Sequence, residues 1–168
     1  MSRGFVREDD QEELPIVPPR ADLPDGQINY VTEVGYNQLL AERDFLLKER
    51  DGLDKNNDTD FRIASNYINA KLLLLNNRIS TAHIINLSNQ HPDVVRFGAK
   101  VTLTVNGGKQ KQKFQIVGVD EADIKKMKIA FTSPLAKILI EKKVGDKAVL
   151  KLEKEDRVFE IVEISYSN

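Results

Sequence analysis

The sequence LLAERDFLLKERDGLDKNNDTDFRIASNYINAKLLLLNNRI, residues 39–79, contains two leucine-rich stretches separated by a polar patch. In the first stretch, Leu39, Leu46 and Leu53 recur at intervals of seven, which is the spacing of a coiled-coil seam. A similar apolar spacing returns after the patch, in Ile68, Leu72, Leu75, Ile79 and Ala82. We therefore predict two antiparallel helices that bury their apolar stripes on each other, because each arm alone would be marginal in water.

A polar cluster after Gly52 predicts the turn between these helices, with the tip near residues 54–63. The cluster consists of residue types that stop helices and accept tight backbone geometry: Asp54, Asn56, Asn57 and Asp58. At the base of the arm, Thr32 can cap a helix that begins at Glu33. The patch is thus expected at the far end of a projecting arm, where a turn is most often only solvated.

Residues 92–168 predict a compact antiparallel sheet with one short helix. Apolar alternation and turn residues outline the expected strands at residues 97–105, 114–119, 128–131, 148–152 and 158–164. Ser133 is expected to cap the helix, whose first position is Pro134. The predicted fold class is therefore α+β, with an antiparallel coiled-coil hairpin over residues 32–88 followed by this curved sheet.

Residues 1–31 are predicted to form a disordered tail, because they are acidic and hold four of the six prolines. The alternative is that Phe5, Ile16 and Val17 dock on a partner as an extended, proline-stiffened strand.

Composition excludes several classes of function. The chain has no cysteine, which rules out disulfides, thiolate zinc sites and cysteine nucleophiles, and its two imidazoles, His83 and His91, are isolated. A net charge of -1 argues against a protein that coats nucleic acid unaided. The apolar run at residues 72–75 is far shorter than the ~20 residues of a membrane helix, and no signal peptide is evident. We expect a cytoplasmic protein that does not bind membranes.

The stretch IVGVDEADIKKMKIAFTSPLAKILIEKKVGDKAVL, residues 116–150, resembles the C-terminal domain of the bacterial GreA and GreB transcript-cleavage factors. The stretch VTEVGYNQLLAERDFL, residues 31–46, resembles the start of that family's first coiled-coil helix. The order of parts is also similar, since a helical hairpin precedes a sheet domain of the FK506-binding-protein (FKBP) type. The resemblance covers residues 31–168 and is most specific over residues 95–164.

The resemblance implies that the partner is bacterial RNA polymerase, with indirect contact to nascent RNA. The sheet domain would dock at the rim of the secondary channel while the tip approaches the catalytic Mg2+, so that the polymerase cleaves its own backtracked RNA. The chain would then be no enzyme by itself and hold no cofactor of its own, sharing Mg2+ only in the complex. Asp60 and Asp58 are the implied catalytic and metal-binding tip acids. The implied partner-binding residues are Ser133, Pro134, Leu135, Asp120 and Glu121.

The tip departs from the family pattern. With Tyr67 as the anchor, the first acid falls on Asp60, but Ile63 and Asn66 occupy the positions of two further acids. Ile63 cannot ligate a metal, although Asp58 could replace the missing acid if the turn directs both carboxylates to one side. The chain could therefore stimulate cleavage, or it could be a non-cleaving regulator that occludes the channel or competes for it; both functions stay open.

More distant alternatives are an FKBP-like prolyl isomerase and a coiled-coil adaptor. A monomer is expected, because the hairpin satisfies its own seam.

Overall fold

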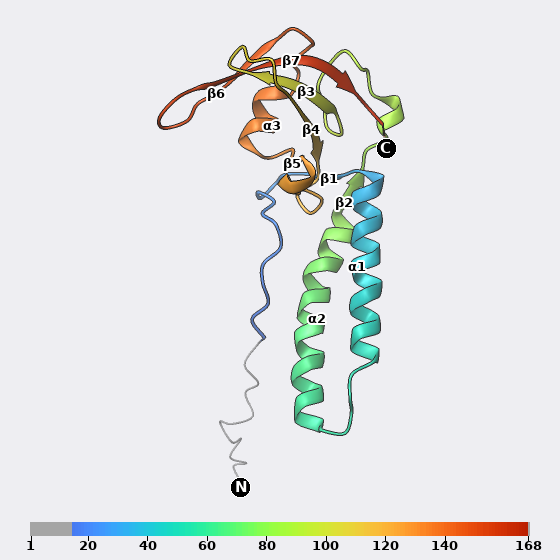
Figure 1. Cartoon of the computed structure of the whole chain (residues 1–168). Coiled ribbons are helices and arrows are strands. Elements are labelled where there is room, and N and C mark those ends of the chain that lie inside the picture. The colour runs from blue at the N-terminus through green and yellow to red at the C-terminus, as the bar shows by residue number, and fades with distance from the viewer. Residues whose placement is uncertain (1–14, 168) are drawn as a thin grey trace.

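The computed structural model describes residues 15–167 and shows a helical hairpin projecting from a sheet domain (Figure 1). The hairpin comprises β1 (Asn29–Val31), α1 (Glu33–Asp51), α2 (Asp58–Thr81) and β2 (Ala82–Ile84). The sheet domain comprises η2 (Leu87–Asn89), β3 (Lys100–Val105), β4 (Lys111–Val117), η3 (Ile124–Lys126), β5 (Lys128–Ala130), α3 (Pro134–Leu139), β6 (Lys147–Leu150) and β7 (Arg157–Ser165). This arrangement confirms the predicted α+β architecture.

The two helices pack through the predicted seam. Their buried residues form one cluster, made of Leu39, Leu46, Ile68, Leu72 and Leu75. Each helix begins at a side-chain cap: the Thr32 hydroxyl accepts a hydrogen bond from the amide of Gly35, and Asn57 accepts one from the amide of Asp60. None of the helices in residues 15–167 combines the length and apolarity that a membrane crossing needs.

The sheet has the strand order β5-β4-β3-β7-β6 and curves over α3 (Figure 1). Its core lies between the sheet and α3, and the largest fully buried side chains there are Leu103, Ile116, Leu139 and Ile161. The β4–β5 pair is parallel, whereas the prediction was an entirely antiparallel sheet. The segment 118–127, which contains η3, carries the chain back so that β5 starts at the same end as β4.

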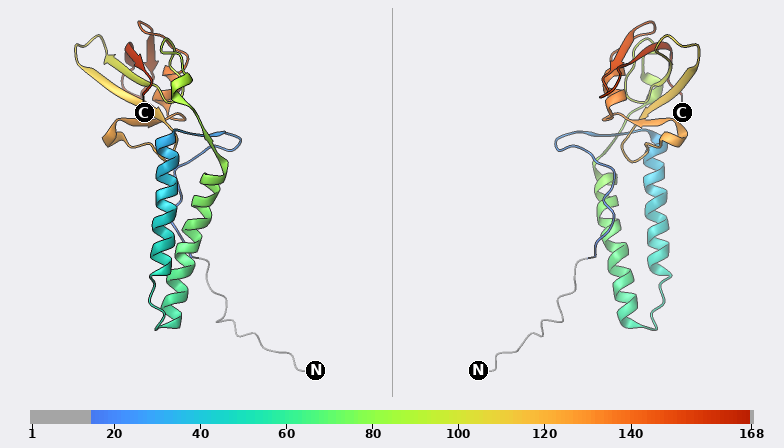
Figure 2. Two further views of the ribbon diagram at one scale, coloured as in Figure 1. Left: turned by 90° about the vertical axis from the view of Figure 1, so that its right-hand side faces the viewer. Right: turned by 60° about the vertical axis from the view of Figure 1, so that its left-hand side comes forward.

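Residues 15–28 run beside the hairpin and lead into β1, which pairs in parallel with β2 (Figures 1 and 2). We call residues 15–28 the strap. The sequence assigned them to a tail because they lack apolar periodicity, yet polar contacts place them against the hairpin. Phe5, one of the candidate docking residues, lies outside the described residues, while Ile16 is 93% exposed and Val17 is half-buried.

Candidate functional site

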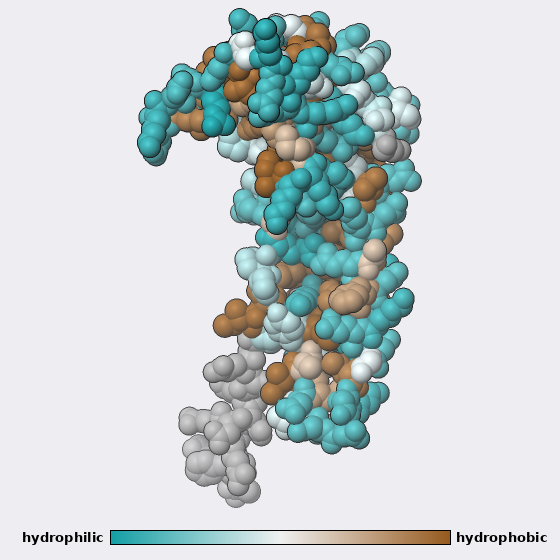
Figure 3. All heavy atoms as spheres, viewed as in Figure 1, coloured by the Kyte–Doolittle hydropathy of each residue, from teal (hydrophilic) through white to brown (hydrophobic). Residues whose placement is uncertain are grey.

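The predicted tip acids lie at the end of the hairpin farthest from the sheet domain (Figure 1). Asp58 and Asp60 both belong to the first turn of α2, and both are exposed. Hydrophilic residues cover this end of the molecule in Figure 3. Acidic side chains are favoured in the first turn of a helix, because the positive end of the helix dipole attracts negative charge.

The helix directs the two carboxylates to different sides. Asp58 is the first residue of α2 and Asp60 the third. Residues two apart on an α-helix do not face each other, whereas residues three apart are neighbours. The neighbour of Asp60 is therefore Ile63, whose side chain is 64% exposed and apolar. Because Asp58 does not lie beside Asp60 on the helix, it does not take the place of the missing acid. The two carboxylates do not converge on one point, so this pair does not fit a shared Mg2+.

The loop before α2 offers no other complete site. The Asp54 carboxylate accepts a hydrogen bond from the amide of Asn56 at 2.9 Å, which shapes the turn. Across residues 15–167, no three His, Cys, Asp or Glu side chains come together in a way that could hold a metal ion.

Three of the predicted partner-binding residues begin α3. Ser133 caps the helix, since its hydroxyl accepts a hydrogen bond from the amide of Ala136 at 3.3 Å. Pro134 follows at the first helical position and is exposed, while Leu135 is half-buried and packs against the core. Pro134 is thus the exposed member of these three residues.

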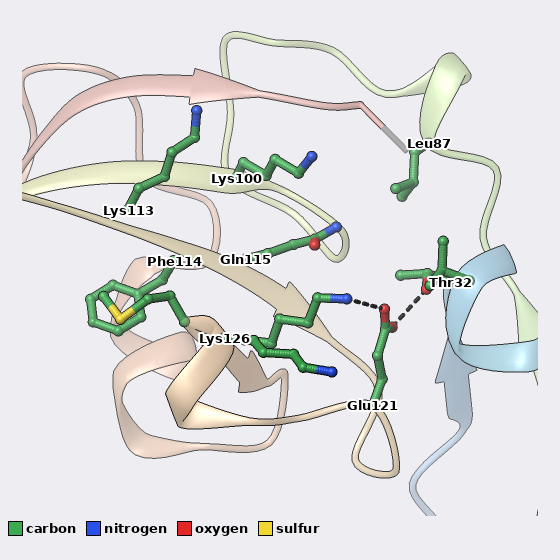
Figure 4. A pocket seen from close by; sticks show the side chains of 11 residues that line it. Thr32, Leu87, Lys100, Lys113, Phe114, Gln115, Glu121 and Lys126 are labelled. Carbon is green, nitrogen blue, oxygen red and sulfur yellow. Dashed lines mark hydrogen bonds and ion pairs between the residues drawn. The ribbon is translucent and has the colours of Figure 1, made fainter. Parts of the chain in front are cut away.

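Asp120 and Glu121 lie instead at the junction between the sheet domain and the hairpin. Glu121 is buried: one carboxylate oxygen accepts a hydrogen bond from the Thr32 hydroxyl at 2.6 Å, and the other is 3.0 Å from the Lys128 ammonium (Figure 4). The Asp120 side chain is 8% exposed and is 2.9 Å from Arg20 Nε. Both carboxylates are thus engaged in internal contacts at this junction, and their role in binding a partner stays a prediction.

Aromatic packing and one close backbone approach complete this junction. The Tyr30 ring of β1 packs against Phe97 and Phe131 of the sheet domain, with ring centroids 5.8 and 5.6 Å apart. A side chain at Gly118 would place its Cβ 2.6 Å from the carbonyl oxygen of Tyr30. Only glycine allows the sheet domain to approach β1 this closely.

Arg20 joins three parts of the molecule. Its Nη atoms bind both carboxylate oxygens of Glu42 in α1 at 2.8 and 3.0 Å, while Nε donates to Asp120. The hydrogen bonds with Glu42, together with Asp120, raise the pKa of the Arg20 guanidinium above its ordinary value, although burial opposes this. This role has no signal in the sequence, because Arg20 lies in a proline-rich stretch without periodicity.

A cavity of about 450 Å³ lies at the same junction. Lysines from the sheet domain line one side, including Lys100, Lys113 and Lys126, and Thr32 lies on the other (Figure 4). Glu121 partly neutralises this lining. We assign no ligand to this cavity.

Comparison with known proteins identifies relatives across both parts of the chain. The family described as "Transcription elongation factor, GreA/GreB, C-term" matches residues 89–166. A protein of Trichlorobacter lovleyi named transcription elongation factor GreA is 36% identical over 151 residues, covering 81% of this chain and 96% of that protein. The protein of the same name from Pelobacter propionicus is 36% identical over 116 residues, covering 67% of this chain and 73% of that protein.

The solved structures that match this chain include the GreA factor homolog 1 of Thermus thermophilus. It is 24% identical, with coverage of 81% of this chain and 97% of that chain and a TM-score of 0.39. The GreA/GreB factor of Nitrosomonas europaea is 15% identical, with coverage of 89% and 100% and a TM-score of 0.42.

Proposed function

Because the chain belongs to the GreA/GreB family of transcription elongation factors, we propose that it regulates bacterial RNA polymerase through the enzyme's secondary channel. The sheet domain would dock at the channel rim, and the hairpin would carry its tip toward the catalytic centre. The observation that carries the proposal is the separation of the two parts, with Asp60 at the projecting end and the exposed Pro134 on the sheet domain. The chain modulates the polymerase and is no enzyme by itself.

The residues at the tip favour a regulator that occludes the channel or competes for it, rather than a factor that stimulates cleavage. Retaining a weakly held Mg2+ favours added carboxylates that converge on one point, because Mg2+ demands near-octahedral oxygen coordination. Asp58 and Asp60 diverge on α2, and the position beside Asp60 is Ile63. Asp60 would approach the catalytic centre as a single carboxylate.

The aromatic packing disfavours a prolyl isomerase. Such an enzyme needs a cleft walled by accessible aromatic rings. Here Phe114 and Phe159 are buried in the core, and Phe97 and Phe131 pack on Tyr30. The coiled-coil adaptor remains the alternative to polymerase binding and is tested directly by the first step of the experiment below.

The experiment adds the chain to core RNA polymerase and then to stalled, backtracked complexes. We expect binding at moderate salt and little RNA cleavage by the parent chain. Ile63→Glu places a carboxylate three residues after Asp60, on the same side of α2. It should raise cleavage by roughly tenfold or more, which corresponds to about 1.4 kcal/mol of transition-state stabilisation.

Matched variants test whether the new carboxylate of Ile63→Glu causes the gain in cleavage. Ile63→Gln has a similar size without the charge and should not gain cleavage, and Asp60→Ala in the Ile63→Glu background should remove the gain. Asp58→Ala should leave the gain unchanged within about twofold, because that carboxylate points elsewhere. Strong cleavage by the parent chain that survives Asp60→Ala would contradict our assignment of the tip. Failure to bind core polymerase would favour the adaptor.

A further inference from the structure

The strap connects the hairpin to the sheet domain mainly through charged and polar groups. Arg20 binds Glu42 of α1 and Asp120 of the sheet domain at once. Arg78 of α2 lies 3.6 Å from the other oxygen of Asp120 and also donates to the carbonyl of Ala21. One carboxylate therefore faces a cation from the strap and a cation from the hairpin.

Arg20 is the more important of the two cations for this connection. Among the described residues, the Oδ2 atom of Asp120 and one Nη atom of Arg78 are buried without a hydrogen-bond partner. The direct hydrogen bond to Asp120 therefore comes from Arg20, at 2.9 Å. Guanidinium has a planar array of donors that can hold two carboxylates in fixed directions, which an ammonium cannot do.

Apart from the contacts of Arg20 and Arg78, the strap buries little apolar surface against the hairpin. A cavity of about 520 Å³ lies between the strap and α1 and α2, bounded by Pro18, Pro19, Phe45 and Leu74. Phe45 is 67% exposed and Leu74 is 38% exposed, so the strap covers the helices incompletely. Its hold on the hairpin depends on the charged network at Arg20.

We propose that Arg20 is a positioning residue, which holds the hairpin at a fixed angle to the sheet domain through Glu42 and Asp120. The consequence for transcription rests on the proposed function. A fixed angle would hold the tip at a constant distance from the surface of the sheet domain that docks at the channel rim. The network spans α1, α2, the strap and the segment after β4. Loss of Arg20 leaves Asp120 without its direct hydrogen bond and detaches α1 from the sheet domain at this point.

Distance measurement between two spin labels tests the proposal on the free chain. The chain has no cysteine, so Asn56→Cys at the tip and Lys109→Cys in the sheet domain can be labelled selectively; both positions are exposed. The parent should give one narrow distance distribution. Arg20→Ala should widen it by roughly twofold or more, and Arg20→Lys should give an intermediate width, because lysine holds one acid at a time.

Controls separate positioning from general stability. Arg157→Ala removes an exposed arginine of β7, away from the junction, and should leave the distribution unchanged. Circular dichroism verifies that each variant is folded. Should Arg20→Ala unfold the chain, Glu42→Gln tests the same network from a more exposed position, since the Glu42 side chain is 43% exposed. Distributions of Arg20→Ala and Glu42→Gln that superimpose on the parent's would overturn the proposal.

A polymerase assay then connects the angle to function. Arg20→Ala should bind core polymerase within about threefold of the parent while the tip-dependent cleavage of the Ile63→Glu background falls by roughly tenfold. An unchanged cleavage rate in a chain with a widened distribution would refute the functional consequence alone. Absence of polymerase binding by the parent would refute the proposed function, whereas the distance measurement on the free chain would still decide the role of Arg20.

Discussion

Asp60 and Ile63 lie three residues apart in α2 and therefore share one side of the helix at the tip. The polar patch in the sequence predicted the position of the tip, and Asp58 and Asp60 do lie there. The relative direction of the two carboxylates depended on whether both residues lie inside α2, because successive residues of a helix are about 100° apart around its axis. Only the structure, with Asn57 as the cap and Asp58 as the first helical residue, separates the two carboxylates.

Tyr166 gives a prediction about pH at the residue scale. Its hydroxyl donates to the carbonyl of Val94 at 2.6 Å and accepts from the amide of Arg96 at 2.8 Å. Burial raises the pKa of the Tyr166 phenol above its ordinary value, although the hydrogen bond from Arg96 opposes this. The neutral phenol is favoured in the folded state. Its contribution to stability is therefore complete below the unfolded pKa near 10 and is lost as the pH rises through the folded pKa.

Tyr166→Phe should lower the free energy of unfolding at neutral pH by about 1–3 kcal/mol, since two hydrogen bonds are lost. The difference from the parent should shrink between about pH 9 and pH 11. Urea unfolding at several pH values measures it. A difference that grows with pH would contradict the raised pKa.

At the scale of elements, the seam of the hairpin was predictable because apolar spacing alone specifies it. Leu75 is fully buried between the helices, whereas Leu73 on the same helix is 72% exposed. Leu75→Ala should cost about 2–5 kcal/mol of unfolding free energy. Leu73→Ala, a change of identical chemistry, should cost about 0.5 kcal/mol or less. Equal losses in chemical denaturation would mean that the helices do not pair through this seam.

The features that the sequence did not predict are held by contacts that produce no periodic pattern of apolar residues. β1 and β2 are three residues each, too short for an alternating pattern, and they pair in parallel across a long separation in sequence. The parallel pairing of β5 depends on the path of residues 118–127. Hydrophobic patterning indicates which segments are strands, but it does not determine the direction in which the chain enters a short edge strand.

At the scale of the whole molecule, the sequence indicated two parts but not how they join. The acids after β4 were predicted to face a partner, yet Asp120 and Glu121 contact the strap and the hairpin. Gly118 permits the close approach, and Tyr30 packs between the parts. A junction assembled from residues near 20, 30 and 120 produces no local pattern, because its members are distant in the chain.

We propose that the hairpin carries Asp60 to the catalytic centre of RNA polymerase while the sheet domain stays at the rim. The most direct test attaches an iron chelate to Asn56→Cys, two residues before α2, and maps where the tethered radical source cuts core polymerase. We predict cuts beside the polymerase's catalytic residues, which disappear when unlabelled parent chain is added in excess. Cuts confined to the outer surface of the polymerase would contradict the account.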